Sequence, residues 1–149
     1  MDYGTTDRCT GGTCTVHQGP NPGNIVDNNN GTYWEGNAGA SLPGFIKYDF
    51  GDGVSWKISK INYRRRSGVA NGVHAYKIRG SNDNTNWNDL TASQNFASSD
   101  GDQTITFTNQ TAYRYVEIYI TSSYDASLVS CEEIQMYEGI YPSGFFAFF

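Results

Sequence analysis

Hydrophobic and polar residues alternate in short runs along most of the chain. In FIKYDFGDG, at 45–53, Ile46, Tyr48 and Phe50 fall on one side of an extended segment and the intervening residues on the other. Alternation with period two is typical of a half-buried β-strand. The same pattern predicts strands at 54–66, 73–81, 103–108, 112–121 and 131–139.

The segments between these runs have the composition of turns. NDNTNWND at 82–89 and ASSDGD at 97–102 are rich in Asn, Asp, Ser and Gly, which favour turn conformations. In the run at 54–66 the alternation changes phase between Ile58 and Ile61, which indicates a β-bulge. Spaced strands without a helical period or βαβ alternation predict an all-β protein, an antiparallel β-sandwich of the jelly-roll type.

Length and composition restrict the function classes. The 149 residues predict a single domain, with an N-terminal extension at 1–23, the sandwich at 24–139 and an aromatic tail at 140–149. The formal net charge of −5 would repel a phosphate backbone, so no nucleic acid is expected as a partner. No apolar run is long enough for a membrane span. Residues 1–16 lack the features of a signal peptide, and we expect a location outside the cell or on the surface of a particle such as a virion.

The cysteines give two readings. Cys9 and Cys14 bracket the flexible sequence TGGT, whereas Cys131 lies far along the chain. Three cysteines allow three single pairings, and the sequence does not choose among them. We favour a local Cys9–Cys14 disulfide over free thiols.

The order of these segments resembles a known family. It begins with Asp27, Asn29 and Thr32, followed by Trp34, and continues through FIKYDFG, YRRR, NG, YKIRGSNDNTNW, AYRYVEIYI and EEIQMYEG. Over roughly residues 24–139 the chain resembles the discoidin domains, also called F5/8 type C domains, which include the family 32 carbohydrate-binding modules. The resemblance implies a jelly-roll β-sandwich without catalytic activity that binds glycans in most members and phospholipid or protein in some.

The resemblance also implies a structural calcium ion. Many of these domains hold it in a loop of pattern D-x-N-x-x-T, which Asp27, Asn29 and Thr32 match, and a glutamate of the last strand, here Glu133, completes the shell. Calcium takes about six to eight oxygen ligands, which carboxylates, hydroxyls and backbone carbonyls supply. The expected carbonyl donors are Asn24, Asn29, Thr32 and Glu132. The alternatives are a sodium ion and an Asx-rich turn without metal. Tyr33 and Trp34, which follow the loop, are expected to be core residues and not ligand contacts.

A glycan site is implied by a second pattern. Galactose-binding members carry Y-x-x-R-x-x-x-x-N-G, which places Arg66 and Asn71 as donors to sugar hydroxyls. Such members usually have a histidine where this chain has Glu35, which puts a standard galactose preference in doubt. Tyr124 is the candidate aromatic platform for the sugar, and Asp125 a further acceptor. Alternatively, Arg66 braces the loop against Glu35 or Asp125 and the site binds no sugar.

Enzymatic classes are not favoured. No G-x-S-x-G, H-E-x-x-H or P-loop motif occurs, and the two histidines lack a matching nucleophile and acid. Glu132 and Glu133 are adjacent, so on a strand they point to opposite faces and cannot flank one glycosidic bond.

The end of the chain suggests a different class of function. The tail YPSGFFAFF carries Phe145, Phe146, Phe148 and Phe149, an apolar run that promotes aggregation unless it is covered. The tail either folds back onto its own sandwich or docks into another protein subunit. The second reading predicts a decoration or structural subunit of an assembly, for example a phage or virus particle.

Overall fold

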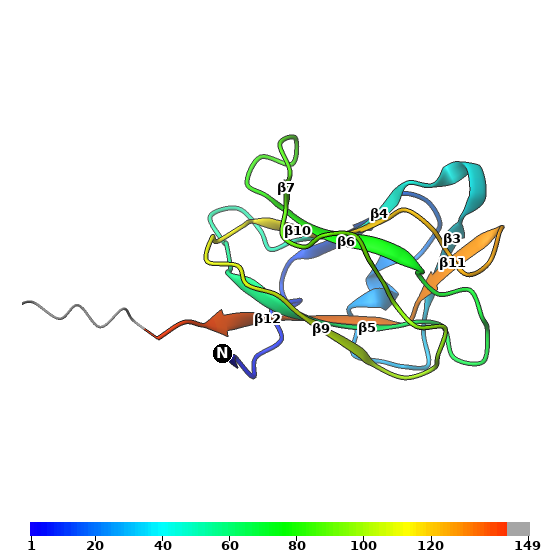
Figure 1. Cartoon of the computed structure of the whole chain (residues 1–149), viewed down its shortest axis with the longest axis horizontal. Coiled ribbons are helices and arrows are strands. Elements are labelled where there is room, and N and C mark those ends of the chain that lie inside the picture. The colour runs from blue at the N-terminus through cyan, green and yellow to red at the C-terminus, as the bar shows by residue number, and fades with distance from the viewer. Residues whose placement is uncertain (143–149) are drawn as a thin grey trace, which may run out of the picture.

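The computed structural model describes residues 1–142, which form two layers of β-sheet (Figure 1). The only helical elements in this part of the chain are two short 3-10 turns, η1 (Pro22–Ile25) and η2 (Gly39–Ser41). The strands are β1 (Asp2–Tyr3), β2 (Thr13–Val16), β3 (Trp34–Asn37), β4 (Gly44–Asp49), β5 (Ile58–Arg64), β6 (Ala75–Ser81), β7 (Asn88–Asp89), β8 (Gln94–Asn95), β9 (Gln103–Thr106), β10 (Tyr115–Ile120), β11 (Leu128–Cys131) and β12 (Glu133–Ile140).

The strands make two main sheets and a short ladder. The large sheet has the order β2-β4-β10-β6-β7, with β8 also paired to β6, and the small sheet has the order β1-β12-β5-β9. β3 pairs with β11 at one end of the sandwich, which we call the rim, whereas the N-terminus lies at the opposite end (Figure 1). All of the strand ladders are antiparallel, so the predicted antiparallel sandwich is confirmed.

The predicted alternation decides which side chains reach the core. In β4, Ile46 and Tyr48 are buried and Lys47 between them is not, because successive side chains point to opposite faces. The predicted bulge falls on Ser59, since the register of β12 against β5 shifts between Tyr137 and Glu138.

The run predicted at 54–66 is shorter as a strand than expected. β5 begins at Ile58, and Val54 at the start of the run is exposed. Trp56 makes a single bridge to Tyr113 without joining a strand. Val54 does not pair with a neighbouring strand, because its backbone N–H donates to the Gly51 carbonyl within the turn Gly51–Val54.

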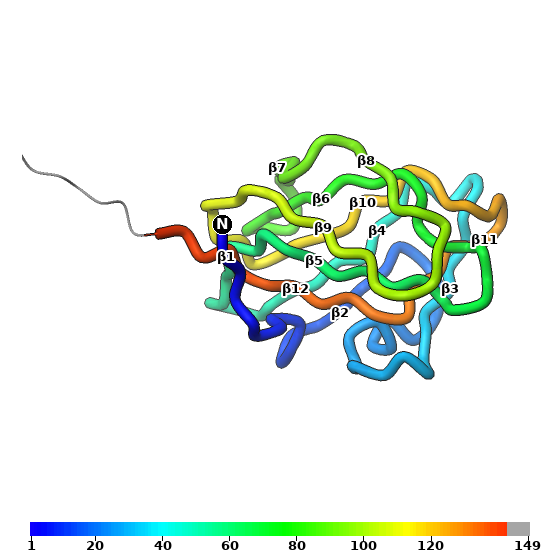
Figure 2. Tube along the Cα trace, turned by 60° about the horizontal axis from the view of Figure 1, so that its bottom comes forward, coloured from blue at the N-terminus to red at the C-terminus, as the bar shows by residue number. Residues whose placement is uncertain are grey.

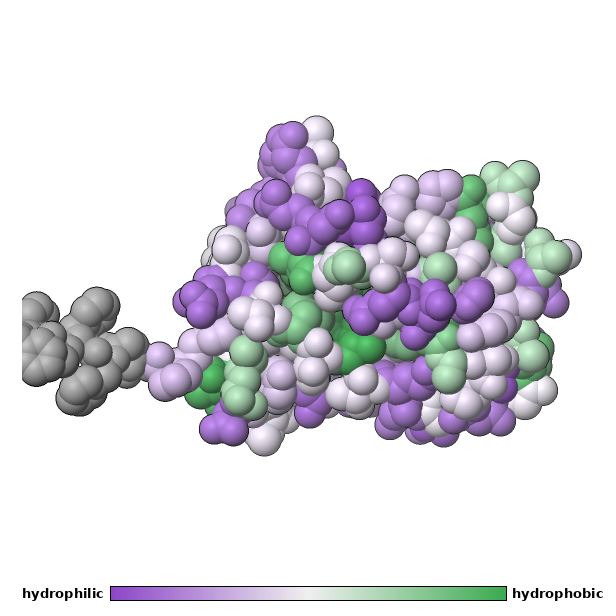
Figure 3. All heavy atoms as spheres, viewed as in Figure 1, coloured by the Kyte–Doolittle hydropathy of each residue, from purple (hydrophilic) through white to green (hydrophobic). Residues whose placement is uncertain are grey.

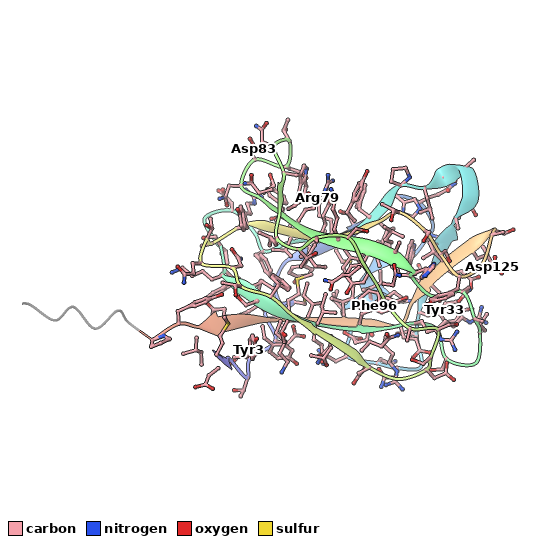
Figure 4. The ribbon with its side chains drawn as sticks, viewed as in Figure 1. Tyr3, Tyr33, Arg79, Asp83, Phe96 and Asp125 are labelled. Carbon is pink, nitrogen blue, oxygen red and sulfur yellow. The ribbon has the colours of Figure 1, made fainter. Side chains whose placement is uncertain are left out.

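Aromatic rings fill the space between the layers. The ring of Phe96 stacks on Tyr76, with centroids 3.9 Å apart, and on Tyr63, at 4.3 Å. Phe96 lies between the two sheets (Figure 4) and comes from the long connection after β8. Stacked rings of this kind join the sheets from the inside, since Tyr76 belongs to the large sheet and Tyr63 to the small one.

The N-terminal region is part of the sandwich. β2 pairs with β4 from Thr13 opposite Asp49 to Val16 opposite Ile46, and β1 lies along β12 (Figure 2). The segment predicted as an extension, residues 1–23, therefore supplies an edge strand to each sheet. Such edge strands are short and polar on their outer face, so their hydrophobic signal in the sequence is weak.

The favoured Cys9–Cys14 disulfide is wrong. Cys9, Cys14 and Cys131 are all free thiols, and all three are buried. Burial raises the pKa of Cys14 to about 12 and raises that of Cys9 and Cys131 as well. These cysteines therefore act as small hydrophobic side chains between the sheets, because Cys14 points inward from β2.

The outer surface is mixed in character. On the face shown in Figure 3, hydrophobic residues appear as small separate patches among hydrophilic ones. No helix in the described part of the chain has the length and hydropathy of a bilayer span. Phe145, Phe146, Phe148 and Phe149, on which the predicted tail docking depends, lie outside the described residues.

Candidate functional site

The Asx-rich loop before β3 closes on its own side chains. Asp27 accepts hydrogen bonds from the backbone N–H of Asn29, at 2.9 Å, and from the hydroxyl of Thr32, at 2.5 Å. Asn24 donates from its side chain to the carbonyl of Tyr33, at 3.0 Å. The three residues of the D-x-N-x-x-T pattern thus lie together in one tight turn.

Glu133, at the start of β12, is a buried carboxylate beside this loop. It is 6% exposed, and both of its carboxylate oxygens are buried without a hydrogen-bond partner among the described residues. Burial first, and then the nearby carboxylates of Asp27 and Asp7, raise the pKa of Glu133 to about 8. The backbone N–H groups of Asn28 and Asn29 face it and lower its pKa, although neither reaches hydrogen-bond geometry.

These contacts fit a bound cation. A buried carboxylate without a donor, next to a second carboxylate, is costly unless a positive charge compensates both. Asp27 and Glu133 are the two predicted carboxylate ligands, and the fold brings them together although they are far apart in the sequence. Within residues 1–142 no three His, Cys, Asp or Glu side chains make a metal cluster, so backbone and side-chain carbonyls would have to supply the remaining ligands.

Glu132 lies between β11 and β12, and its side chain bonds to groups other than those beside Glu133. It accepts from the guanidinium of Arg64, at 3.0 Å, and from the backbone N–H and hydroxyl of Ser67, at 2.6 and 3.1 Å. Its carboxylate therefore fixes the loop after β5. The metal role predicted for Glu132 concerned its backbone carbonyl and remains a prediction.

The rim brings Glu35, Arg66 and Asn71 together. Oε2 of Glu35 accepts a hydrogen bond from Nη1 of Arg66, at 3.0 Å, and another from Nδ2 of Asn71, at 2.7 Å. Asn71 is 1% exposed, and its Oδ1 accepts from the hydroxyl of Ser130. The Ser130 hydroxyl oxygen in turn accepts from the backbone N–H of Arg66, at 3.1 Å. The three predicted residues thus form one network held by β3 and β11.

Tyr33 belongs to this site, and its predicted place in the core is wrong. The guanidinium carbon of Arg66 lies 4.1 Å from the centre of the Tyr33 ring, which is 38% exposed. Trp34 is fully buried, as predicted. The alternation of a strand gives the reason, since Trp34 points inward and its neighbours Tyr33 and Glu35 must point outward. That alternation is the signal by which the sequence identifies Tyr33.

Tyr124 and Asp125 bond elsewhere on the rim. The hydroxyl of Tyr124 donates to the carbonyl of Phe96, at 2.7 Å, and its ring packs against His74 with centroids 4.3 Å apart. Asp125 accepts from the backbone N–H groups of Ser127 and Leu128, and so shapes the turn before β11. Asp125 and Tyr33 lie at the same end of the sandwich (Figure 4). Tyr124 is 40% exposed there, and its role as a sugar platform remains a prediction.

A groove of about 460 Å³ lies between the Asx-rich loop and the network of Glu35. It is lined by Pro20, Asn21, Asn24, Gly31, Thr32, Tyr33 and Glu35. The lining combines an exposed aromatic ring with amide, hydroxyl and carboxylate oxygens. Sugars have apolar ring faces and hydroxyl edges, so a groove of this composition is suited to them. Pro20 and Asn21 have no distinguishing pattern in the sequence.

The family model of the F5/8 type C domain matches residues 10–134 of the chain. A search of curated proteins gave no match.

Solved structures of family 32 carbohydrate-binding modules are similar to the whole sandwich. A module of Clostridium perfringens NanJ in complex with galactose is 19% identical, with a TM-score of 0.73 over 88% of this chain and 96% of that one. A C. perfringens module in complex with GalNAc-β-1,3-galactose is 22% identical, with a TM-score of 0.72 over 87% and 96%. Chitosan-binding module 2 of a Paenibacillus sp. IK-5 chitosanase/glucanase, in complex with chitotriose, is 24% identical, with a TM-score of 0.73 over 89% and 100%. At these identities the likeness establishes the fold.

Proposed function

Because the chain belongs to the F5/8 type C domain family, we propose that it is a non-catalytic, extracellular glycan-binding module whose site is the groove beside Tyr33, Glu35 and Arg66. The observation that carries the proposal is the hydrogen-bonded network of Arg66, Glu35 and Asn71 next to an open groove. The site lies on the rim, where loops from both sheets meet and where a polysaccharide chain has access from solvent.

Each side chain of the site has a separate role in binding a sugar. Tyr33 offers an aromatic ring for the apolar face of a pyranose, and Arg66 holds that ring in place by stacking on it. Glu35 offers a carboxylate oxygen to a sugar donor group, and Arg66 keeps further N–H donors for sugar oxygens. Asn71 is buried and positions Glu35.

The structural neighbours support glycans as the ligand class. The three similar structures are complexes with galactose, GalNAc-β-1,3-galactose and chitotriose. All three of these bound molecules are saccharides. For this chain, the carboxylate of Glu132 is bonded to Arg64 and Ser67 whereas Glu133 lies beside Asp27, and these separate surroundings support a non-catalytic role.

We further propose that calcium stabilises the rim. Asp27 and Glu133 would hold the ion through their carboxylates, with carbonyl oxygens of Asn24, Asn29, Thr32 and Glu132 as the remaining protein ligands. The unpartnered oxygens of Glu133 support this assignment. Calcium would supply charge compensation there and tie the loop that shapes the groove to the last strand, with no part in chemistry.

Replacing Arg66 by alanine is expected to weaken glycan binding by about tenfold or more, because the change removes the donors of the guanidinium and the cation that holds Tyr33. A glycan array followed by titration calorimetry with the best ligand measures the effect. Arg114→Ala is the matched control, since its side chain is 29% exposed against 33% for Arg66 and pairs with Asp49 away from the rim. Equal binding by both variants and the wild type would remove the rim site.

The assembly role is the second candidate, motivated by the four phenylalanines of the tail. Its test is deletion of residues 143–149, which keeps Tyr141, whose hydroxyl accepts from the backbone N–H of Asn109, at 2.7 Å, and contacts Ser59. If the tail docks into other subunits, the deletion converts a large species into monomers in light scattering. An unchanged mass, with an unchanged melting temperature, would count against docking.

A further inference from the structure

The rim network leaves one carboxylate oxygen of Glu35 for a ligand. Both Arg66 and Asn71 donate to Oε2 of Glu35, and the other end of the Asn71 amide is taken by Ser130. Among the described residues, no hydrogen bond or ion pair reaches Oε1 of Glu35. Arg66 and Asn71, the residues expected to donate to a neutral sugar's hydroxyls, thus already donate to Glu35. Glu35 itself is in contact with the groove.

The groove itself carries only one charged residue. Of its lining residues, Glu35 is the one with an acidic side chain, which is 23% exposed. The other polar groups, from Asn21, Asn24 and Thr32, include amide and hydroxyl oxygens that accept hydrogen bonds. The surface presented to a ligand is therefore rich in acceptors.

An ammonium group on a sugar suits this surface. It has three donors and no acceptor, and a hydrogen bond between ionised partners is roughly twice as strong as one between neutral groups. A hydroxyl would give Oε1 a single neutral donor, and an N-acetyl group would place an acceptor carbonyl near the carboxylate. The charge of Arg66 opposes a second cation, but Arg66 is already paired with Oε2 of Glu35 and stacked on Tyr33.

We propose that the rim groove binds a cationic amino sugar, such as a glucosamine-containing polysaccharide, through an ion pair between the sugar ammonium and Oε1 of Glu35. The inference rests on the proposed glycan-binding function and specifies its ligand class. Asn71 and Ser130 act as positioning residues, because both are buried and set the orientation of Glu35. Tyr33 supplies the ring on which the pyranose lies.

Titration calorimetry of the full chain with three probes tests the proposal. The probes are the glucosamine trimer, its fully N-acetylated counterpart and galactose. We expect the glucosamine trimer to bind at least about tenfold more tightly than the neutral sugars. Salt at about 0.5 M screens interactions between exposed charges, so it should weaken the binding of the charged trimer and leave that of the neutral sugars unchanged. Equal affinity for the charged and neutral trimers would overturn the amino-sugar assignment.

Glu35→Gln refines the test without removing the site's shape. Glutamine keeps an oxygen for Arg66 and Asn71 but no charge, so the preference for the charged trimer should fall about tenfold while the melting temperature stays close to wild type. Glu138→Gln is the control, since its side chain is 28% exposed against 23% for Glu35 and pairs with Arg8 at the other end of the sandwich. An undiminished preference in Glu35→Gln would overturn the ion pair.

The amino-sugar assignment and the glycan-binding function are contradicted by different results. Binding of galactose or the neutral trimer, lost in Arg66→Ala but indifferent to Glu35→Gln, would leave the glycan site in place and remove only the amino sugar. Absence of binding to any glycan on an array, by wild type and variants alike, would remove the glycan-binding function itself.

Discussion

Replacing Trp34 by alanine is expected to lower the free energy of unfolding by about 3–5 kcal/mol, the usual cost of deleting a large buried aromatic side chain. Trp34 is fully buried, and its ring N–H donates to the carbonyl of Gln18, at 2.9 Å. The backbone is fitted closely around it, since a Cβ added at Gly36 would come within 2.4 Å of the Trp34 ring. The cavity could not collapse without moving β3. Urea denaturation followed by circular dichroism measures the change.

The adjacent aromatic residue is the control. Tyr33→Ala should cost about 1 kcal/mol or less, because the ring is 38% exposed and its main contact is the stacked guanidinium of Arg66. The same variant should weaken glycan binding. Comparable losses of stability at both positions would contradict the assignment of Trp34 to the core and Tyr33 to the site.

Removing divalent ions is expected to lower the Tm by about 5–10 °C. A ligand present at about 100 times its dissociation constant stabilises the native state by about 2.7 kcal/mol, and a domain of this size loses about 2–4 °C per kcal/mol. The expected site of this effect is Glu133, whose carboxylate oxygens are buried without a donor. Thermal melts with calcium and with EGTA, at constant ionic strength, measure the difference.

The neighbouring glutamates separate an ion effect from a general loss of stability. Glu133→Gln should abolish the response to EGTA, and in EGTA it should be at least as stable as the wild type, because a buried acidic group without a hydrogen-bond partner has been removed. Glu132→Gln should lower the Tm by breaking contacts with Arg64 and Ser67, yet keep the response to EGTA. A wild-type Tm that ignores both EGTA and added calcium would exclude a structural calcium ion.

The strands were predictable because their signal is local. Period-two alternation depends only on which face of a strand meets the core, so the segments around Ile46, Ile78 and Ile118 could be placed without a structure. The edge strand β2 was not, since it is short and buries few side chains. The cysteines were misjudged for the same reason. A spacing that permits a Cys9–Cys14 bridge does not show that β2 turns Cys14 into the core.

The sequence supplied candidate residues for the sites but not the bonds between them. The resemblance to the F5/8 type C domains singled out Glu35, Arg66 and Asn71, and the fold brings them within hydrogen-bond distance. The sequence did not indicate that Asn71 would be buried and hydrogen-bonded to Ser130, or that the guanidinium of Arg66 would stack on the ring of Tyr33. Tyr124, chosen by its position in a loop, bonds to Phe96 instead.

By itself the sequence determined the all-β sandwich and the residue types available at its rim, because alternation and turn composition act over a few neighbouring positions. Only the tertiary structure decided which polar groups satisfy one another and which remain for a ligand. That outcome depends on side chains such as Glu35 and Asn71, or Asp27 and Glu133, that are far apart along the chain and meet only when β3, β11 and β12 pack together.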